Sequence, residues 1–298
     1  MLSAIPASEA AILRIPTLND ERADFTKLFQ LWQRAVAAKS LQIIFDFTDC
    51  RFLKQNAVAF LGGLARLLEF EGKQTIFAWS TLQDNVQMNL CQNGFRAVFE
   101  EGFTSWQGNS IPYREDPDDK LEPIVDYLDQ QWLGRGWVQI GESLKDQIIG
   151  TMLEIYSNAF EHGQSPIGTF SCGQRYPNLN LLKLTTIDFG VGIPANVCDF
   201  VQDPTMRSED ALEWAFQPGK TTRQGNIPGG CGLDMLKTFV KEKQGKIEIY
   251  SHDGYALIDA NQELYESSES FFKGTLINVT VQCDLTYYNS NMSEIIVP

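Results

Sequence analysis

The sequence predicts a mixed α/β protein made of two units, an N-terminal α/β unit and a C-terminal unit of α+β layers. The chain of 298 residues is long enough for two domains of about 150 residues each. Its first part alternates short apolar strands with an amphipathic helix, and its last part runs helix, strands, helix, strands. Its composition, with 43% apolar and 21% charged residues, is that of a globular protein.

In the N-terminal unit, a β-branched and aromatic run over 41–47 predicts a buried strand. An amphipathic helix follows over about 55–69, and a glycine stops it. The apolar run over 74–79 predicts a second strand. Strand, helix and strand at this spacing imply a parallel pair with a right-handed crossover. We expect a further helix over 84–90 and a turn at 93–95 that leads into a last extended piece.

Between the two units the composition becomes acidic. Between about residues 110 and 130 there are seven Asp and Glu residues, and the basic residues are Arg114 and Lys120. We expect a solvated linker that runs into a surface helix, with an acidic docking segment as the alternative. The prediction divides the chain into an N-terminal domain at 1–108, an acidic linker and helix at 109–136, and a C-terminal domain at 137–298.

Charge and composition argue against several classes of function. A net charge of −14 argues against sequence-independent DNA binding, which depends on basic side chains that neutralise phosphates. The chain has two histidines, and no two of its six cysteines lie closer than 26 residues, so we expect no His-rich metal site, zinc knuckle or CxxC pair. The longest apolar run, five residues, is far too short to cross a bilayer. We expect a cytoplasmic protein with free thiols and no DNA or membrane partner.

An amphipathic helix with a buried apolar stripe is predicted over 142–162. Glu154 and Asn158 are four residues apart, so they are neighbours on one face of this helix. His162 lies four residues further on, just before a glycine that is a plausible helix stop. A carboxylate, an amide and an imidazole along one edge indicate either a chemical site or a solvated helix face.

Two further segments combine a regular element with glycines. A strand ends at Asp188, and Gly190 and Gly192 follow it. Glycines in this position permit positive φ angles and a close backbone approach to a flat ligand, and Asp188 could then accept a hydrogen bond from an exocyclic amine. Ordinary turn chemistry is the alternative. Later, Gly274 and Thr275 open the last predicted strand, at 273–281, which follows a strand at 245–251.

A glycine-rich loop that leads into an amphipathic helix at about 233–240 predicts an anion site, because free backbone amides and the helix dipole point at the ligand. Its GKTT stretch departs from a Walker A motif, since a Trp occupies the first glycine position. The loop supplies basic side chains and glycines, namely Lys220, Arg223, Gly229, Gly230 and Gly232.

Taken in order, ExxxNAxxHG, DxGxG followed by IP, GGxGL and a strand that opens with GT resemble the motifs of the GHKL superfamily, whose Bergerat fold binds ATP. The resemblance covers about 137–283. NAFEHG and DFGVGIP are most similar to the anti-sigma-factor serine kinases and the sensor histidine kinases.

The resemblance implies ATP and Mg²⁺ as cofactors, and a role for each motif residue. Asn158 would ligate Mg²⁺, a hard cation that suits an amide oxygen, and Glu154 would be the general base or orient water. Asp188 would bind the adenine amino group, with Thr275 supporting it through water. Gly190 and Gly192 would line the base. The implied phosphate contacts are His162, Lys220, Arg223, Gly229, Gly230 and Gly232. His162 has an equally good alternative role as a partner of the helix dipole.

Two features depart from the sensor histidine kinases. Asp234 stands where their last motif has its second glycine, which places a negative charge near the phosphates. No histidine precedes His162, so autokinase activity of that type is excluded.

The N-terminal stretch FDFTDCRFLKQNAVAFLGGL resembles the strand, loop and helix of STAS domains over about 10–108. The loop position that carries a phosphorylated Ser in that family reads Lys54, Gln55 and Asn56 here.

The resemblance therefore implies an ATP·Mg²⁺-binding regulator that acts on a partner protein encoded nearby. It would act as a serine/threonine-type kinase or as a nucleotide-gated switch. One alternative is a slow ATPase whose lid, at about 216–232, closes on ATP and drives dimerisation or effector engagement. The other is a binding-only scaffold, motivated by Asp234. Whether the chain forms a homodimer stays open.

Overall fold

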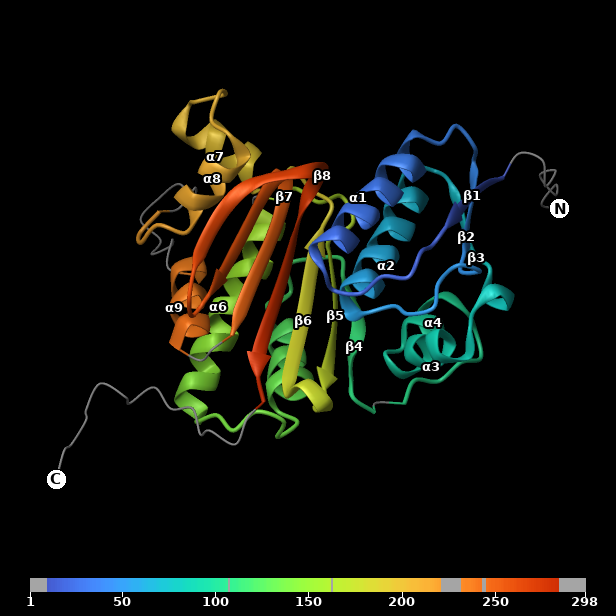
Figure 1. Ribbon diagram of the computed structural model, residues 1–298, viewed down its shortest axis with the longest axis horizontal. Helices are drawn as coiled ribbons and strands as arrows, with labels where there is room; N and C mark the ends of the chain where they lie inside the picture. Colours follow the sequence, from blue (N-terminus) through green and yellow to red (C-terminus); the bar gives the residue numbers. More distant parts are fainter. Residues whose placement is uncertain (1–9, 107, 162, 221–231, 243–244, 284–298) are drawn as a thin grey trace.

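The computed structural model describes residues 10–106, 108–161, 163–220, 232–242 and 245–283. Its elements form a mixed α/β structure of four layers, a three-stranded sheet, a helical layer, a five-stranded sheet and a second helical layer (Figure 1). The predicted α/β class is confirmed at this level. No helix in the described part of the chain has the length and apolar character needed to cross a bilayer.

The small sheet is parallel in the order β1-β2-β3, and its two helices lie between it and the large sheet. The predicted strand, helix and strand are present, with the two strands in parallel register. The elements are β1 (Ala11–Arg14), α1 (Arg22–Ala37), β2 (Gln42–Asp46), α2 (Gln55–Phe70) and β3 (Gln74–Phe77).

The end of the N-terminal unit differs from the prediction. After a 3-10 turn at Trp79–Thr81, α3 (Asp84–Gln92) lies where a helix was predicted. The turn at 93–95 leads into a short helix, α4 (Phe95–Phe99), rather than an extended piece. The reason is local, because the Asn93 side chain accepts a hydrogen bond from the Phe95 amide at 3.0 Å and Phe95 packs among other aromatic rings.

The segment predicted as an acidic linker forms regular secondary structure that belongs to the second unit. Strand β4 (Ser110–Asp116) pairs antiparallel with β5 at the edge of the large sheet. Helix α5 (Leu121–Asp126) and a π-helix at Tyr127–Leu133 follow, and the Trp132 side chain is fully buried. The acidic count was misleading because some carboxylates are paired, such as that of Asp116 with Arg114.

The large sheet is antiparallel, in the order β4-β5-β6-β8-β7. The predicted helix over 142–162, the strand ending at Asp188 and the helix over 233–240 are all present. The last two strands are much longer than predicted and form a hairpin. The elements are α6 (Glu142–Glu161), β5 (Thr169–Tyr176), β6 (Leu181–Asp188), α7 (Ile193–Val201), α8 (Ser208–Ala215), α9 (Gly232–Glu242), β7 (Lys246–Asp259) and β8 (Glu263–Gln282), with a 3-10 turn at Pro177–Leu179.

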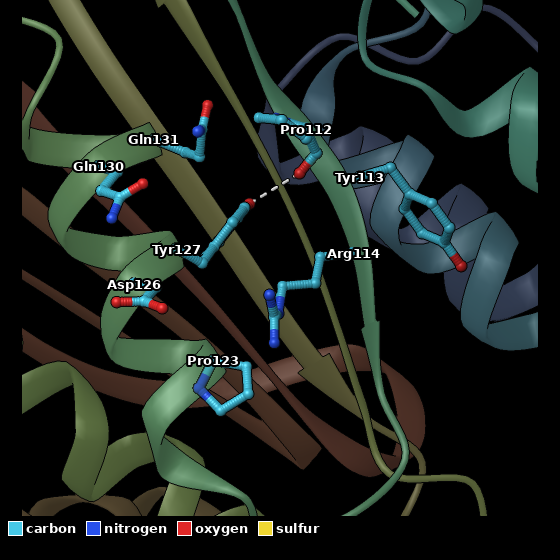
Figure 2. Close-up of a pocket in the computed structure, with 8 residues that line it drawn as sticks. All are labelled: Pro112, Tyr113, Arg114, Pro123, Asp126, Tyr127, Gln130 and Gln131. Atoms are coloured by element: carbon cyan, nitrogen blue, oxygen red, sulfur yellow. Dashed lines mark hydrogen bonds between the residues drawn. The ribbon is translucent and has the colours of Figure 1, made fainter. Parts of the chain in front are cut away.

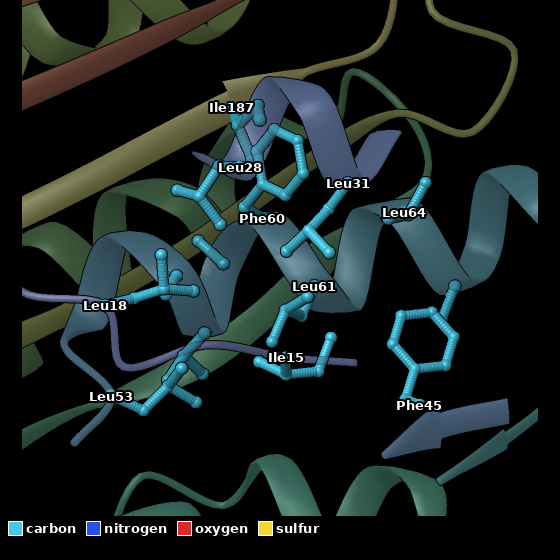
Figure 3. Packing of buried hydrophobic residues seen from close by; sticks show 14 of the residues in the cluster. Ile15, Leu18, Leu28, Leu31, Phe45, Leu53, Phe60, Leu61, Leu64 and Ile187 are labelled. Carbon is cyan, nitrogen blue, oxygen red and sulfur yellow. The ribbon is translucent and has the colours of Figure 1, made fainter. Parts of the chain in front are cut away.

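The two units share one of the two apolar cores. Helices α1 and α2 cover one face of the large sheet, where the Phe29 ring stacks on Phe272 at 5.0 Å between centroids. Figure 3 shows Phe60 and Leu28 beside Ile187 of β6. Helices α6 and α9 cover the opposite face with a separate core. The helices that the sequence assigned to an independent N-terminal domain therefore fill the space between both sheets.

Candidate functional site

A line of buried polar side chains crosses the large sheet near one end, with one residue from each strand. In the strand registers, each of these residues lies directly opposite the next. Each is at most 7% exposed. We call this line the polar row; its members, in sheet order, are Asp116, Thr169, Asp188, Thr275 and Ser251.

The polar row faces the layer that contains helix α6. Successive side chains of a strand point to opposite faces of its sheet. In β6, Leu182 and Leu184 pack in the core with α6 and α9, whereas Ile187 packs in the core with α1 and α2. Asp188 therefore lies on the α6 side, together with its neighbours in the row.

Asp188, the predicted adenine ligand, is a buried carboxyl. One of its oxygens, Oδ1, accepts a hydrogen bond from the Gly190 amide at 2.8 Å. Burial raises the pKa of Asp188 from its ordinary value of 3.8 to about 7, although hydrogen bonds from Gly190 and Thr275 oppose the rise. A carboxyl in this setting can still accept a hydrogen bond from a ligand amine, because its two oxygens offer about four acceptor positions.

The loop over 189–192 needs both of its glycines. A Cβ atom on Gly190 would overlap the carbonyl oxygen of Gly163. Gly192 has a φ angle of +83°, and a Cβ on it would lie 2.7 Å from the Lys273 carbonyl oxygen. The two glycines thus let the loop approach both the end of α6 and the start of the Thr275 segment. Of the two, Gly192 has the positive φ angle that the DxGxG pattern permits, and the predicted approach to a flat ligand stays a prediction.

Backbone hydrogen bonds join this loop to the helix that carries Glu154 and Asn158. The Val191 amide donates to the Gly163 carbonyl at 2.6 Å, and the Gly163 amide donates to the Asn158 carbonyl at 2.9 Å. Glu154 and Asn158 are half-buried neighbours on α6. The structure therefore brings the ExxxNA and DxGxG segments together, although nearly 30 residues separate them in the sequence.

Helix α6 is fixed on the sheet by a hydroxyl cluster. Tyr156 lies between Glu154 and Asn158 in the sequence and is fully buried. Its hydroxyl is 2.6 Å from Ser171 Oγ and 3.3 Å from Thr186 Oγ1. Because residues two apart on a helix point in nearly opposite directions, Glu154 and Asn158 lie away from Tyr156. Anchoring Tyr156 therefore sets the direction of both predicted functional side chains.

The predicted phosphate contacts are placed only in part. His162, Arg223, Gly229 and Gly230 lie outside the described residues, as does most of the predicted lid. Gly232 is the first residue of α9, in keeping with a glycine-rich entry into a helix. The Lys220 ammonium lies 5.5 Å from the centre of the Trp214 ring of α8. It therefore makes a cation–π contact with α8, and no described contact joins it to the polar row.

Sequence reasoning missed three residues around Asp188. Thr169 and Ser251 belong to the polar row, and the imidazole of His252 contacts the 189–192 loop, with Nε2 2.7 Å from the Val191 carbonyl oxygen. None of the described residues forms a hydrogen bond with Thr169 Oγ1, although that atom is buried. The sequence shows that these polar residues stand at or near strand ends. That position indicates a shared site only once the strand register places them beside Asp188 and Thr275.

A concave region lies on β4 and the π-helix, as Figure 2 shows. This pocket has a volume of about 390 Å³. The Tyr127 hydroxyl donates to the Pro112 carbonyl oxygen at 2.8 Å beside it, and the Arg114 guanidinium there is paired with Asp116. It contains none of the site residues that the sequence predicts. Its lining residues are Pro112, Tyr113, Arg114, Pro123, Asp126, Tyr127, Gln130 and Gln131.

Comparison with known proteins gives no match to a family model and no match to a curated protein. The interpretation of the polar row therefore depends on its geometry and chemistry.

Proposed function

We propose that this chain is an ATP·Mg²⁺-binding regulator of the GHKL type, which acts on a partner protein as a serine/threonine-type kinase or a nucleotide-gated switch. One observation carries the proposal. A buried carboxyl, Asp188, lies in register with Thr275 and next to a glycine loop that contacts the Glu154–Asn158 helix. Three sequence motifs, distant in the chain, thus converge on one end of a sheet.

The adenine base is the ligand group that best suits Asp188. An exocyclic amine donates hydrogen bonds, and Asp188 supplies a buried acceptor. Thr275 and the unpaired hydroxyl of Thr169 flank it in the polar row, where they offer both donors and acceptors to the rest of the base edge. Gly190 and Gly192 let the loop pack closely on Gly163 and Lys273, which keeps the loop backbone beside Asp188.

Asn158 is the residue that fits a magnesium ion. Mg²⁺ prefers oxygen ligands and binds through one or two protein groups plus substrate phosphates. The described residues include no group of three or more Asp, Glu, His or Cys that suits a metal ion, so a single amide oxygen that shares the ion with phosphates suits this site. Bound there, Mg²⁺ neutralises phosphate charge. In a chain with a net charge of −14, this also offsets repulsion by the protein itself.

Glu154 is placed to act beside Asn158 because the two are neighbours on α6. We assign it the role of accepting the proton from an attacking hydroxyl or of orienting that group. The hydroxyl that matches the STAS position is missing from this chain, and Gln55 and Asn56, at that position, are at most 2% exposed. This loop therefore offers no acceptor for a phosphoryl group, and we assign the acceptor to a partner protein.

The experiment compares wild type with Asn158→Ala, Glu154→Gln and a control, Asp146→Asn. Asp146 is an exposed residue of the same helix. ATP affinity is measured by calorimetry with and without Mg²⁺, and γ-labelled ATP follows transfer to protein or release as phosphate. We expect Asn158→Ala to abolish the gain in affinity that Mg²⁺ provides, and Glu154→Gln to bind ATP but lose turnover.

The outcomes separate the alternatives. Label on a partner supports a kinase, free phosphate supports an ATPase, and binding without either supports a switch or scaffold. Tight ATP·Mg²⁺ binding that Asn158→Ala leaves unchanged would contradict the assignment of the site, as would an Asp146→Asn effect of equal size.

A further inference from the structure

Strand β7 contains an irregularity at the point where it passes the 189–192 loop. Its register with β8 shifts on both sides of His252, which marks a β-bulge. His252 also has a φ angle of +55°, in the left-handed region that side chains other than glycine seldom adopt. Bulges beside functional sites re-aim side chains, and strained backbone persists where surrounding contacts hold it. We call residues 251–253 the bulge segment.

Each residue of the bulge segment holds a different part of the chain that follows Asp188. Ser251 Oγ accepts a hydrogen bond from the Ile193 amide at 3.0 Å, at the first residue of α7. His252 Nε2 donates to the Val191 carbonyl oxygen, a distance of 2.7 Å. Asp253 accepts a hydrogen bond from the Ser208 hydroxyl at the first residue of α8.

Ser251 ties the same loop to β8 as well. Its hydroxyl donates to the Gly274 carbonyl oxygen at 2.9 Å and lies 3.3 Å from Thr275 Oγ1. A Cβ on Gly192 would lie 2.8 Å from Ser251 Oγ and 2.9 Å from His252 Cδ2, so the loop is pressed directly against the bulge segment. One serine thus fixes the spacing between the glycine loop and Thr275, the two sides of the site around Asp188.

Helix α1 supports the bulge segment from the opposite side of the hairpin. The His252 ring lies 5.0 Å from the Phe271 ring. The Trp32 ring lies 6.4 Å from that of Phe271, and Gln33 Nε2 donates to the Phe271 carbonyl oxygen at 3.1 Å. The N-terminal unit therefore contacts the residues that pack on His252.

We propose that Ser251 and His252 are positioning residues, which hold the 189–192 loop in place beside Asp188 for binding the base of a nucleotide. They act through the loop backbone and do not contact the ligand themselves. This inference rests on the proposed function for the identity of the ligand, but its structural part concerns the loop alone. A loop without these hydrogen bonds would leave the Ile193 amide and Val191 carbonyl to water, and the gap between Gly192 and Thr275 would vary.

The experiment measures two quantities in wild type, Ser251→Ala, His252→Ala, the conservative variants Ser251→Thr and His252→Gln, and a control, Ser267→Ala. Ser267 is exposed and lies opposite Gly254 in the same hairpin. Amide hydrogen exchange over 189–197 is measured without nucleotide, and ATP·Mg²⁺ affinity is measured by calorimetry. The conservative variants keep a hydroxyl acceptor at 251 or an N–H donor at 252, and they guard against variants that fail to fold.

We expect Ser251→Ala and His252→Ala to exchange the 189–197 amides about tenfold faster, the size expected for one lost hydrogen bond. We also expect ATP·Mg²⁺ affinity to fall about tenfold, with the conservative variants close to wild type and the control unchanged. Unchanged exchange and affinity in both alanine variants would overturn the proposal. If wild type bound no nucleotide but loop exchange rose only in the alanine variants, the positioning role would stand and the proposed function would fall.

Discussion

The two faces of the large sheet both bury polar groups, but they pair them differently. Towards α1, the carboxylate of Asp20 is paired with Lys183 and accepts a hydrogen bond from Asn278 at 3.0 Å. Asn278 also accepts from Thr185 at 2.8 Å and donates to Glu248 at 3.2 Å. Each of these polar groups has a partner inside the protein.

The polar row on the α6 face is different. The carboxyl of Asp188 is buried with a raised pKa, and the buried hydroxyl of Thr169 has no hydrogen-bond partner among the described residues. Unpartnered buried hydroxyls also occur on the α1 face, at Tyr250 and Thr280, so the hydroxyl groups do not distinguish the two faces. The difference therefore lies in the carboxyl groups: Asp20 on the α1 face is paired with a basic side chain, whereas, among the described residues, the causes that set the pKa of Asp188 on the α6 face include no basic partner. We propose that this difference suits Asp188 to a hydrogen bond from a ligand.

The largest effect is expected for a substitution that breaks the Asp20–Lys183 ion pair on the α1 face. Lys183→Met leaves Asp20 as an uncompensated buried charge, since both side chains are at most 10% exposed. Removing one partner of a buried pair typically costs about 3–5 kcal/mol of stability. Denaturant unfolding followed by circular dichroism measures it. The double variant Lys183→Met, Asp20→Asn is expected to recover much of the loss, and a loss below about 1 kcal/mol for the single variant would show that this face does not depend on the pair.

A smaller effect concerns the pH dependence that the carboxyl group of Asp188 gives to stability. Because the folded-state pKa of Asp188 is raised from 3.8 to about 7, its contribution to stability is present below pH 4 and is lost as pH rises towards 7. Asp188→Asn removes this dependence. The stability of Asp188→Asn minus that of wild type should therefore rise by on the order of 3 kcal/mol between pH 5 and pH 8. A difference that stays flat across this range, measured by urea unfolding, would mean that Asp188 is already charged at pH 5.

The smallest effect is expected when one buried threonine hydroxyl is removed from each face of the large sheet. Thr169→Val replaces an unpartnered buried hydroxyl with a methyl group of similar shape, so stability should change by less than about 1 kcal/mol. The affinity for ATP·Mg²⁺ should fall several-fold, because a group that offers a hydrogen bond to the base is lost. The matched variant on the other face is Thr185→Val, whose hydroxyl is already used by Asn278. It should lose stability and keep nucleotide affinity, and the reverse pattern would contradict the comparison.

Much of the fold could be predicted from periodicity alone. The stripes of α2 and α6, the strand ending at Asp188 and the parallel β2–β3 pair all follow from local apolar spacing. The segment over 109–136 was harder, because counting charges hides an edge strand in which the buried Ile111 and Tyr113 precede the paired charges of Arg114 and Asp116. The packing of α1 and α2 onto the second sheet depends on long-range contacts that no local pattern specifies.

The candidate site could be predicted in part for the same reason. Asp188, Gly190 and Gly192 are consecutive or nearly so, and their glycines reveal them. Thr169 and Ser251 join them only through the registers of β5, β6, β8 and β7, and these registers cannot be deduced from composition. His252 contacts Val191 because a bulge re-aims it, an irregularity with no signature in a single sequence.

The most direct test of the central claim, that Asp188 binds the base of an adenine nucleotide, is a calorimetric titration of wild type and Asp188→Asn with ATP and with GTP, each with Mg²⁺. Because adenine carries an exocyclic amine where guanine carries a carbonyl, a buried acceptor at Asp188 should favour ATP. We predict that wild type binds ATP at least about tenfold more tightly than GTP, and that Asp188→Asn loses this preference. Equal binding of the two nucleotides, or a preference that Asp188→Asn leaves intact, would contradict the account.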